Sequence, residues 1–193
     1  WGRAFDSLTA LERVLAGTFA SVSARTAGFA TIDVGTLRST TWIVLMVLMW
    51  IGASPSSTGG GIKTSAAAVL FAVFVGELRG HPPRLAFRAL GASTVRRAIV
   101  VALASLAVFT MVTLGLTLTD DQPPLALAFE AMSALTTTGL STGITAAVSD
   151  AGRLLLVVAM FLGRLGPVTV ALAVGGTQRR ERFALPTQEL QVW

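Results

Sequence analysis

The sequence predicts an all-α integral membrane protein, and three observations lead to this fold class. First, 53% of the 193 residues are hydrophobic and only 13% are charged, whereas an average soluble domain is about 45–50% apolar and about 25% charged. Second, long uncharged stretches reach the length of a membrane-crossing helix. Third, the chain has no cysteine and one histidine, which excludes disulfides and zinc-thiolate sites. This composition argues against an ordinary soluble enzyme.

Two stretches have the length and apolarity of complete membrane spans. A helix needs about 20 apolar residues to cross a hydrocarbon core about 30 Å thick. Residues 98–118 carry no charge, and residues 154–174 carry a single one, Arg164, at the midpoint. A charge at that depth costs a few kcal/mol, so its default interpretation is a functional residue that faces a cavity. We therefore expect both spans, with Arg164 directed toward a pore or a partner helix.

A third apolar region, residues 41–75, is too long for one straight crossing and is interrupted by small and polar residues. The interruption consists of Gly52, Ala53, Ser54, Pro55, Ser56, Ser57, Thr58, Gly59, Gly60 and Gly61. We interpret the region as two half-spans, 41–51 and 62–75, joined by this loop at membrane depth. The backbone groups of such a loop must be covered by protein or by a water-filled cavity. The loop 52–61 is therefore predicted to line a cavity.

Two shorter segments are predicted to be half-helices that enter the membrane without crossing it. Thr9 and Glu12 form a capping-box pattern that opens a helix to about Ala24. A Pro-Pro pair opens a second helix over residues 125–135, because proline is well tolerated in a first turn. Glu130 lies in this second helix, and the sequence leaves open whether it is a buried hydrogen-bonding partner or a surface-facing acid.

The arginines predict the orientation in the membrane. Residues 79–97 carry five arginines and no acidic residue, and residues 177–193 carry three arginines. By the positive-inside rule, both segments are cytoplasmic, so the half-helices enter from the outside of a plasma (inner) membrane. The net charge of +5 could also suit nucleic acid. We reject that use because long apolar spans flank the arginine cluster.

The sequence repeats itself at an offset of 111 residues. The matching pairs include Thr26 with Thr137, Gly28 with Gly139, Met49 with Met160, and Gly52 with Gly163. The repeated unit is a half-helix, a Thr-x-Gly-x turn and a span, and an additional span precedes the second copy. This pattern divides the chain into 1–78 (half-helix, turn and broken span), a basic cytoplasmic linker at 79–97, a complete repeat at 98–176, and a cytoplasmic tail at 177–193. The chain, which begins with Trp1, is expected to be a fragment holding the end of one repeat and one complete repeat.

A span, a pore helix, a glycine turn and a second span together have the organisation of a cation filter. The C-terminus of the half-helix carries about half a negative charge from its dipole. Backbone carbonyls in the turn can replace the hydration shell of an ion, and glycine permits conformations that other residues avoid. The two candidate filter segments are Thr26-Ala27-Gly28-Phe29 and Thr137-Thr138-Gly139-Leu140.

Four motifs resemble those of the Trk/Ktr/HKT potassium-uptake superfamily, and the KtrB-type (TrkH-like) membrane subunit is the nearest likeness. The motifs are SARTAGF at 23–29, GASPSSTGGGIKT at 52–64, TGLS at 138–141 and MFLGRLGP at 160–167. They lie in family order and extend over nearly the whole chain. The resemblance implies a potassium-channel-like pore made of four repeats in one polypeptide. This chain would hold the end of the third repeat and all of the fourth.

The resemblance also implies roles for individual residues. Gly28 and Gly139 match the filter glycines that accompany potassium preference in this family, so potassium would bind the backbone carbonyls of the two segments. The loop 52–61 matches an intramembrane gate below the filter, and Arg164 matches the basic residue that faces it. The implied partners are membrane lipid, the missing N-terminal repeats, a second copy in a homodimer, and a cytosolic nucleotide-binding ring of the KtrA/TrkA type.

Two other functions stay open on the residues alone. A secondary transporter could use the broken helix at 41–75 for a different solute. A membrane scaffold could bind a cytosolic partner through residues 79–97 and the tail. An enzyme is the weakest class, because the sequence contains no catalytic constellation and suggests no covalent cofactor. Lys63 follows three glycines, but Ile62 interrupts the contiguous Gly-Lys-Ser/Thr of a phosphate-binding loop.

Overall fold

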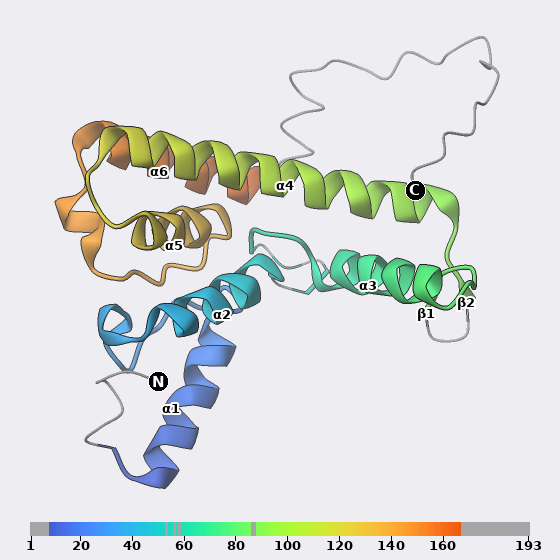
Figure 1. Cartoon of the computed structure of the whole chain (residues 1–193), viewed down its shortest axis with the longest axis horizontal. Helices are drawn as coiled ribbons and strands as arrows, with labels where there is room; N and C mark the ends of the chain where they lie inside the picture. Colours follow the sequence, from blue (N-terminus) through green and yellow to red (C-terminus); the bar gives the residue numbers. More distant parts are fainter. Residues whose placement is uncertain (1–7, 53, 56, 58, 86–87, 167–193) are drawn as a thin grey trace.

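In the computed structural model, the described residues are 8–52, 54–55, 57, 59–85 and 88–166, and they are mostly helical (Figure 1). The elements in chain order are α1 Ala10–Ser23, the 3₁₀ helix η2 Val34–Thr36, α2 Ser39–Trp50, α3 Thr64–Leu78, β1 Arg84–Leu85, β2 Arg88–Ala89, α4 Ala92–Thr119, α5 Pro124–Leu135, the 3₁₀ helix η3 Ile144–Ala147 and α6 Asp150–Leu165. The strands β1 and β2 form one short antiparallel hairpin. The predicted tail, 177–193, lies outside the described residues.

The two short helices begin where the sequence predicts. At the start of α1, the Thr9 hydroxyl accepts a hydrogen bond from the Glu12 amide, and the Glu12 carboxylate accepts one from the Thr9 amide at 2.8 Å. This reciprocal pair satisfies two amides that a helix N-terminus leaves without partners. α5 begins with Pro124 in its first turn. The local signals therefore position both helices to within a few residues.

The helix α4 has the length and hydropathy of a complete membrane span, with 28 residues and a mean hydropathy of 2.4 over its most apolar window. Among the described helices, it alone meets both criteria. It begins at Ala92, within the predicted linker, so Arg96 and Arg97 lie in its first turns. The helix α6 has 16 residues and ends at Leu165, one residue before the last described residue, Gly166. The remainder of the predicted span 154–174 lies outside the described residues.

The helix α5 is the centre of the packing. Figure 1 shows α4 and α6 side by side with α5 against them, and α2 approaching α5 from the opposite side. One apolar cluster joins α4, α5 and α6 through Val112, Leu116, Leu127, Ala131, Ala134, Val148, Leu156 and Ala159. A second cluster joins α2 to α5 and to the two turn segments through Ala24, Val34, Leu37, Leu45, Met49, Phe129, Met132 and Leu140. The chain segments after α1 and α5 are thereby brought together.

Candidate functional site

The two predicted filter segments have the same unusual backbone conformation. Thr26 and Gly28 have φ of 70° and 76°, and Thr137 and Gly139 have φ of 54° and 94°. Among the described residues, these two threonines are the only non-glycine positions with positive φ. A bulky residue in this region is a genuine outlier, and such strain gathers at functional sites. At the offset of 111 residues, Thr26 corresponds to Thr137 and Gly28 to Gly139, so the unusual conformation is repeated with the sequence.

The alternation of φ has a consequence for the carbonyl groups. In an extended strand successive carbonyls point to opposite sides. A left-handed residue at every second position rotates the intervening peptide planes, which lets neighbouring carbonyls face one side. Rings of such carbonyls are how a filter replaces the hydration shell of a cation. The backbone conformation of 26–29 and 137–140 is therefore compatible with cation binding by main-chain oxygens.

The two segments touch each other although they are far apart in the sequence. A Cβ atom added to Gly28 would lie 1.9 Å from the carbonyl oxygen of Thr138 and 3.2 Å from the Cα atom of Gly139. A real Cβ cannot approach a backbone oxygen this closely, so position 28 has no room for any side chain. The structure thus brings the two predicted filter segments into backbone contact.

Each segment is tied to the end of its own helix by a serine. The Ser23 hydroxyl donates to the carbonyl of Phe29, and the Gly28 amide donates to the Ser23 carbonyl at 3.1 Å. In the second copy, the Gly139 amide donates to the Ser133 hydroxyl at 3.1 Å, and the Thr138 amide donates to the Ser133 carbonyl at 3.0 Å. These bonds hold the turn backbone against the helix C-terminus, where the dipole is negative.

The acid in α5 is buried beside the second segment. Glu130 is 5% exposed, and its carboxylate accepts hydrogen bonds from the residues that follow Leu140. This answers the question that the sequence left open in favour of a buried hydrogen-bonding partner. A cavity of about 420 Å³ borders this region, with Ser133, Thr137 and Gly139 in its lining.

The loop 52–61 contacts the beginning of the second segment. The Gly60 amide donates to the carbonyl of Thr136 at 3.1 Å and to the hydroxyl of Thr137 at 3.0 Å. The two ends of the loop are joined, because the Gly52 amide donates to the Ile62 carbonyl at 2.9 Å. Of the residues predicted to form the gate, Ala53, Ser56 and Thr58 lie outside the described residues.

Two basic side chains that the sequence did not assign to the loop also hold it. The Lys63 ammonium donates to the carbonyls of Ser57 and Gly59, both at 2.7 Å. The guanidinium of Arg25 donates to the Gly52 carbonyl at 3.3 Å. The position of Lys63, two residues after the last glycine of the loop, was the one sequence signal for its role, since a long cationic side chain there can reach back to loop carbonyls.

Arg164 is exposed in the last turn of α6. Its neighbour Gly163 is buried against the end of α5, where an added Cβ would lie 1.9 Å from the carbonyl oxygen of Leu135. That Arg164 faces the loop 52–61 stays a prediction. The described part of the chain contains no group of three or more His, Cys, Asp or Glu side chains able to hold a metal ion.

Several characterised proteins are similar to this chain over most of its length. The Ktr system potassium uptake protein B of Bacillus subtilis is 34% identical over 170 residues, which is 88% of this chain and 38% of that protein. The protein of the same name from Vibrio alginolyticus is 39% identical over 166 residues, which is 86% of this chain and 36% of that protein. The potassium/sodium uptake protein NtpJ of Enterococcus hirae is 30% identical over 191 residues, covering 95% of this chain and 42% of that protein.

The chain therefore spans roughly two fifths of the length of these relatives. The family model described as TrkH, cation transport protein, matches residues 3–178. Both findings confirm the resemblance that the four sequence motifs indicated. They also agree with the prediction that the chain is not an enzyme, because the relatives are uptake proteins. The chain belongs to the TrkH family of cation transport proteins.

Proposed function

We propose that this chain is the C-terminal part of a potassium-uptake protein of the plasma membrane, and that segments 26–29 and 137–140 form two sides of its selectivity filter. Potassium would be bound by the backbone carbonyls of these residues. The observation that carries the proposal is the backbone contact between Gly28 and Thr138, made by two turns with the same alternation of positive φ. The names of the relatives, which are potassium uptake proteins, support potassium as the cation.

The loop 52–61 is the proposed gate. Its hydrogen bonds from Gly60 to Thr136 and Thr137 support a position at the inner end of the filter. Because Lys63 bonds two loop carbonyls, it would stabilise one loop conformation. Arg164 would face the loop from α6 and repel cations that leave the filter or bond the loop carbonyls.

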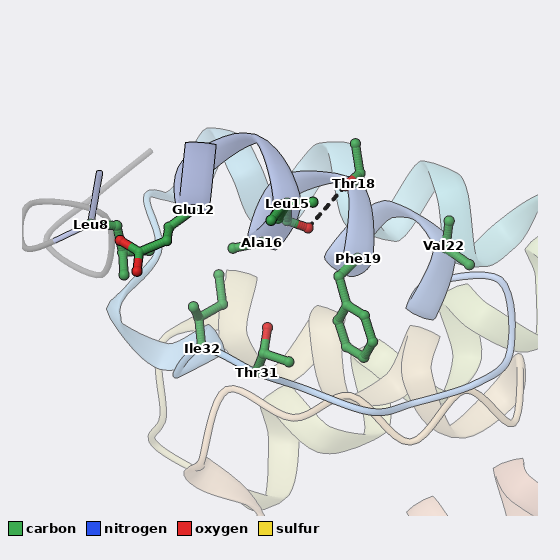
Figure 2. Close-up of a pocket in the computed structure, with 9 residues that line it drawn as sticks. All are labelled: Leu8, Glu12, Leu15, Ala16, Thr18, Phe19, Val22, Thr31 and Ile32. Atoms are coloured by element: carbon green, nitrogen blue, oxygen red, sulfur yellow. Dashed lines mark hydrogen bonds between the residues drawn. The ribbon is translucent and has the colours of Figure 1, made fainter. Parts of the chain in front are cut away.

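The remaining sides of the pore would come from further repeats of the same polypeptide. The support is the exposure of α1, on which Leu11, Val14 and Val22 are 69%, 62% and 70% exposed. A groove of about 610 Å³ on this helix is lined mainly by apolar side chains. Figure 2 draws them, Leu15 and Phe19 among them. In the second copy, by contrast, α5 is covered by α2, α4 and α6. Lipid or protein must cover such an apolar helix, and the proposal assigns neighbouring repeats to α1.

The assembly around this chain follows the same proposal. The protein would cross the membrane several times with its C-terminus in the cytoplasm, because the arginines of 79–97 and 177–193 favour that side. It would form a homodimer and bind a cytosolic nucleotide-binding ring of the KtrA/TrkA type, as the resemblance implies.

The test is rubidium and sodium uptake by the complete protein that carries this chain, in cells lacking their own potassium uptake. Gly139→Ser is the test variant. A Cβ at position 139 meets nothing closer than 3.8 Å, so the substitution acts on the backbone conformation rather than by collision. Gly80→Ser is the matched control, since Gly80 also has positive φ, at 63°, and open space around it. We expect rubidium preference in the wild type and in Gly80→Ser, and a lower rubidium-to-sodium ratio in Gly139→Ser.

Two results would contradict this function. Uptake of a larger solute without cation uptake would favour the secondary transporter. A well-expressed protein that moves no solute but retains a cytosolic partner would favour the scaffold.

A further inference from the structure

Glu130 of α5 has a complete set of hydrogen-bond donors around its carboxylate. Its Oε1 atom accepts from the Ser141 hydroxyl at 2.8 Å, the Thr142 amide at 2.8 Å and the Thr142 hydroxyl at 3.0 Å. Its Oε2 atom accepts from the Thr145 hydroxyl at 2.8 Å. The four donors come from one short stretch of chain. All four bonds therefore join α5 to one segment, residues 141–145.

The site is suited to an ionised carboxylate. A buried charge is costly unless it is hydrogen-bonded, and an ionised carboxylate accepts hydrogen bonds without donating any. Here it meets three hydroxyls and one amide. Hydrogen bonds to a charged acceptor are about twice as strong as neutral ones. Glu130 therefore binds the 141–145 segment more firmly than a neutral side chain of the same shape would.

The clamped segment begins directly after the filter. Residues 137–140 are bonded at their inner end to Ser133, through the amides of Thr138 and Gly139. At the outer end, the chain continues into Ser141, whose hydroxyl is bonded to Glu130. Both anchors belong to α5 and lie about one helical turn apart. The backbone of 137–140 is thus fixed between two points on one helix.

The first copy has no such clamp. The residue that corresponds to Glu130 at the offset of 111 is Phe19, an apolar side chain that is 41% exposed. The first filter segment is bonded to Ser23 through the Gly28 amide and the Phe29 carbonyl, so a serine at the end of α1, and no carboxylate at position 19, holds its outer end. The clamp is a device of the second copy.

We propose that Glu130 is a positioning residue of the filter: its carboxylate holds residues 141–145 against α5 and thereby keeps the carbonyls of 137–140 at the spacing that suits potassium. This inference rests on the proposed function of 137–140 as a filter segment. Glu130 acts through the backbone and does not itself contact the ion.

The experiment measures the rubidium-to-sodium uptake ratio and the amount of protein in the membrane, in the complete protein. Glu130→Gln keeps the shape and one acceptor oxygen, which the Thr142 amide can still use. Glu130→Leu removes every acceptor. Because each step removes hydrogen bonds that a charged acceptor strengthens, we expect the ratio to fall stepwise, by about tenfold in Glu130→Leu, where 1.4 kcal/mol corresponds to a factor of ten.

A second variant distinguishes the proposed role of Glu130 from a simple loss of folding. Thr145→Val removes the bond to Glu130 and the contact with the Ser141 hydroxyl, both in the chain that follows the filter, and α5 stays intact. Its matched control is Thr110→Val, because the Thr110 hydroxyl bonds only a carbonyl of its own helix, that of Leu106, at 2.9 Å. We expect a reduced ratio in Thr145→Val and the wild-type ratio in Thr110→Val.

Three outcomes would overturn the proposal. An unchanged ratio in Glu130→Leu, with lower uptake in proportion to lower protein, would make Glu130 a purely structural residue. An equal loss in Glu130→Gln and Glu130→Leu would assign the effect to charge instead of position. A wild-type ratio in Thr145→Val would show that the clamp does not reach the filter. If the wild type itself lacked rubidium preference, the proposed function would fail before the clamp was tested.

Discussion

The two copies of the repeated unit have the same backbone conformation in the turn and differ in how much of the preceding helix is buried. Both have positive φ at corresponding threonines and glycines, and the helices that follow, α2 and α6, begin at Ser39 and Asp150, at the same offset of 111. Yet nine residues of α5 are buried, whereas α1 has only Ser23 buried. The comparison teaches that the turn is a local property of its Thr-x-Gly sequence, while burial depends on neighbouring elements.

The copies also differ after the second helix. The helix α2 ends at Trp50, two residues before Gly52, and the chain turns into the loop 52–61. In the second copy, α6 continues past the corresponding Gly163 to Leu165. The interruption is therefore a feature of one copy, and it brings Gly60 against the turn of the other.

The largest effect is expected from Gly28→Ala, compared with Gly139→Ala. A methyl group at 28 would collide with the Thr138 carbonyl, whereas position 139 has space. Overpacking costs about 1–3 kcal/mol, and the positive φ adds to it. We expect Gly28→Ala to abolish rubidium uptake and lower the unfolding temperature in detergent, and Gly139→Ala to change mainly the rubidium-to-sodium ratio. Equal unfolding temperatures would contradict the close contact between the copies.

The effect on rubidium uptake is expected to be smaller for Phe129→Ala and Phe19→Ala, which test the coverage of the two helices through stability. Phe129 is fully buried and packs on Trp42 with ring centroids 6.2 Å apart, so truncation costs about 3–5 kcal/mol where the site cannot relax. If further repeats cover α1, Phe19→Ala also destabilises the complete protein measurably. We expect both variants to unfold at lower temperature. A neutral Phe19→Ala would mean that α1 stays exposed in the complete protein.

The smallest effect is a pH dependence at the start of α6. The hydroxyl of Thr119 and the amide of Ser149, both 2.6 Å from the Asp120 carboxylate, hold the pKa of Asp120 below its ordinary value of 3.8. Because the folded pKa is the lower one, the stabilisation is present above pH 3.8 and is lost as the pH falls through the folded pKa. The start of α2, the helix that corresponds to α6, has no side-chain cap at Arg38 and therefore no counterpart of this bond.

Thermal unfolding of wild type and Asp120→Asn over a pH series checks this. We expect the wild type to be more stable near neutral pH and the difference to shrink below pH 4. If the difference in unfolding temperature between wild type and Asp120→Asn stayed constant with pH, the stabilisation would come from the shape of the side chain and not from its charge.

Much of this arrangement follows from local sequence signals. The capping box at Thr9, the proline pair before Leu125 and the two Thr-x-Gly turns all act within a few residues, and each lies where the sequence predicts. The start of α4 was less predictable, because Arg96 and Arg97 are good helix formers although their charges suggested a linker. The partners of Glu130 were beyond prediction, since they lie 11 to 15 residues later and depend on how that chain folds back on α5.

The end of α5 limits which substitutions the protein can accept. The carbonyl oxygen of Leu135 lies between Gly60 and Gly163, where added Cβ atoms would lie 2.6 and 1.9 Å away. The obstacle is a main-chain atom, which every amino acid carries at position 135. A second-site mutation that shrinks a neighbouring side chain therefore cannot rescue a side chain at 60 or 163. Selection for suppressors of such variants would recover true revertants or shifts of a whole helix, and no local compensations.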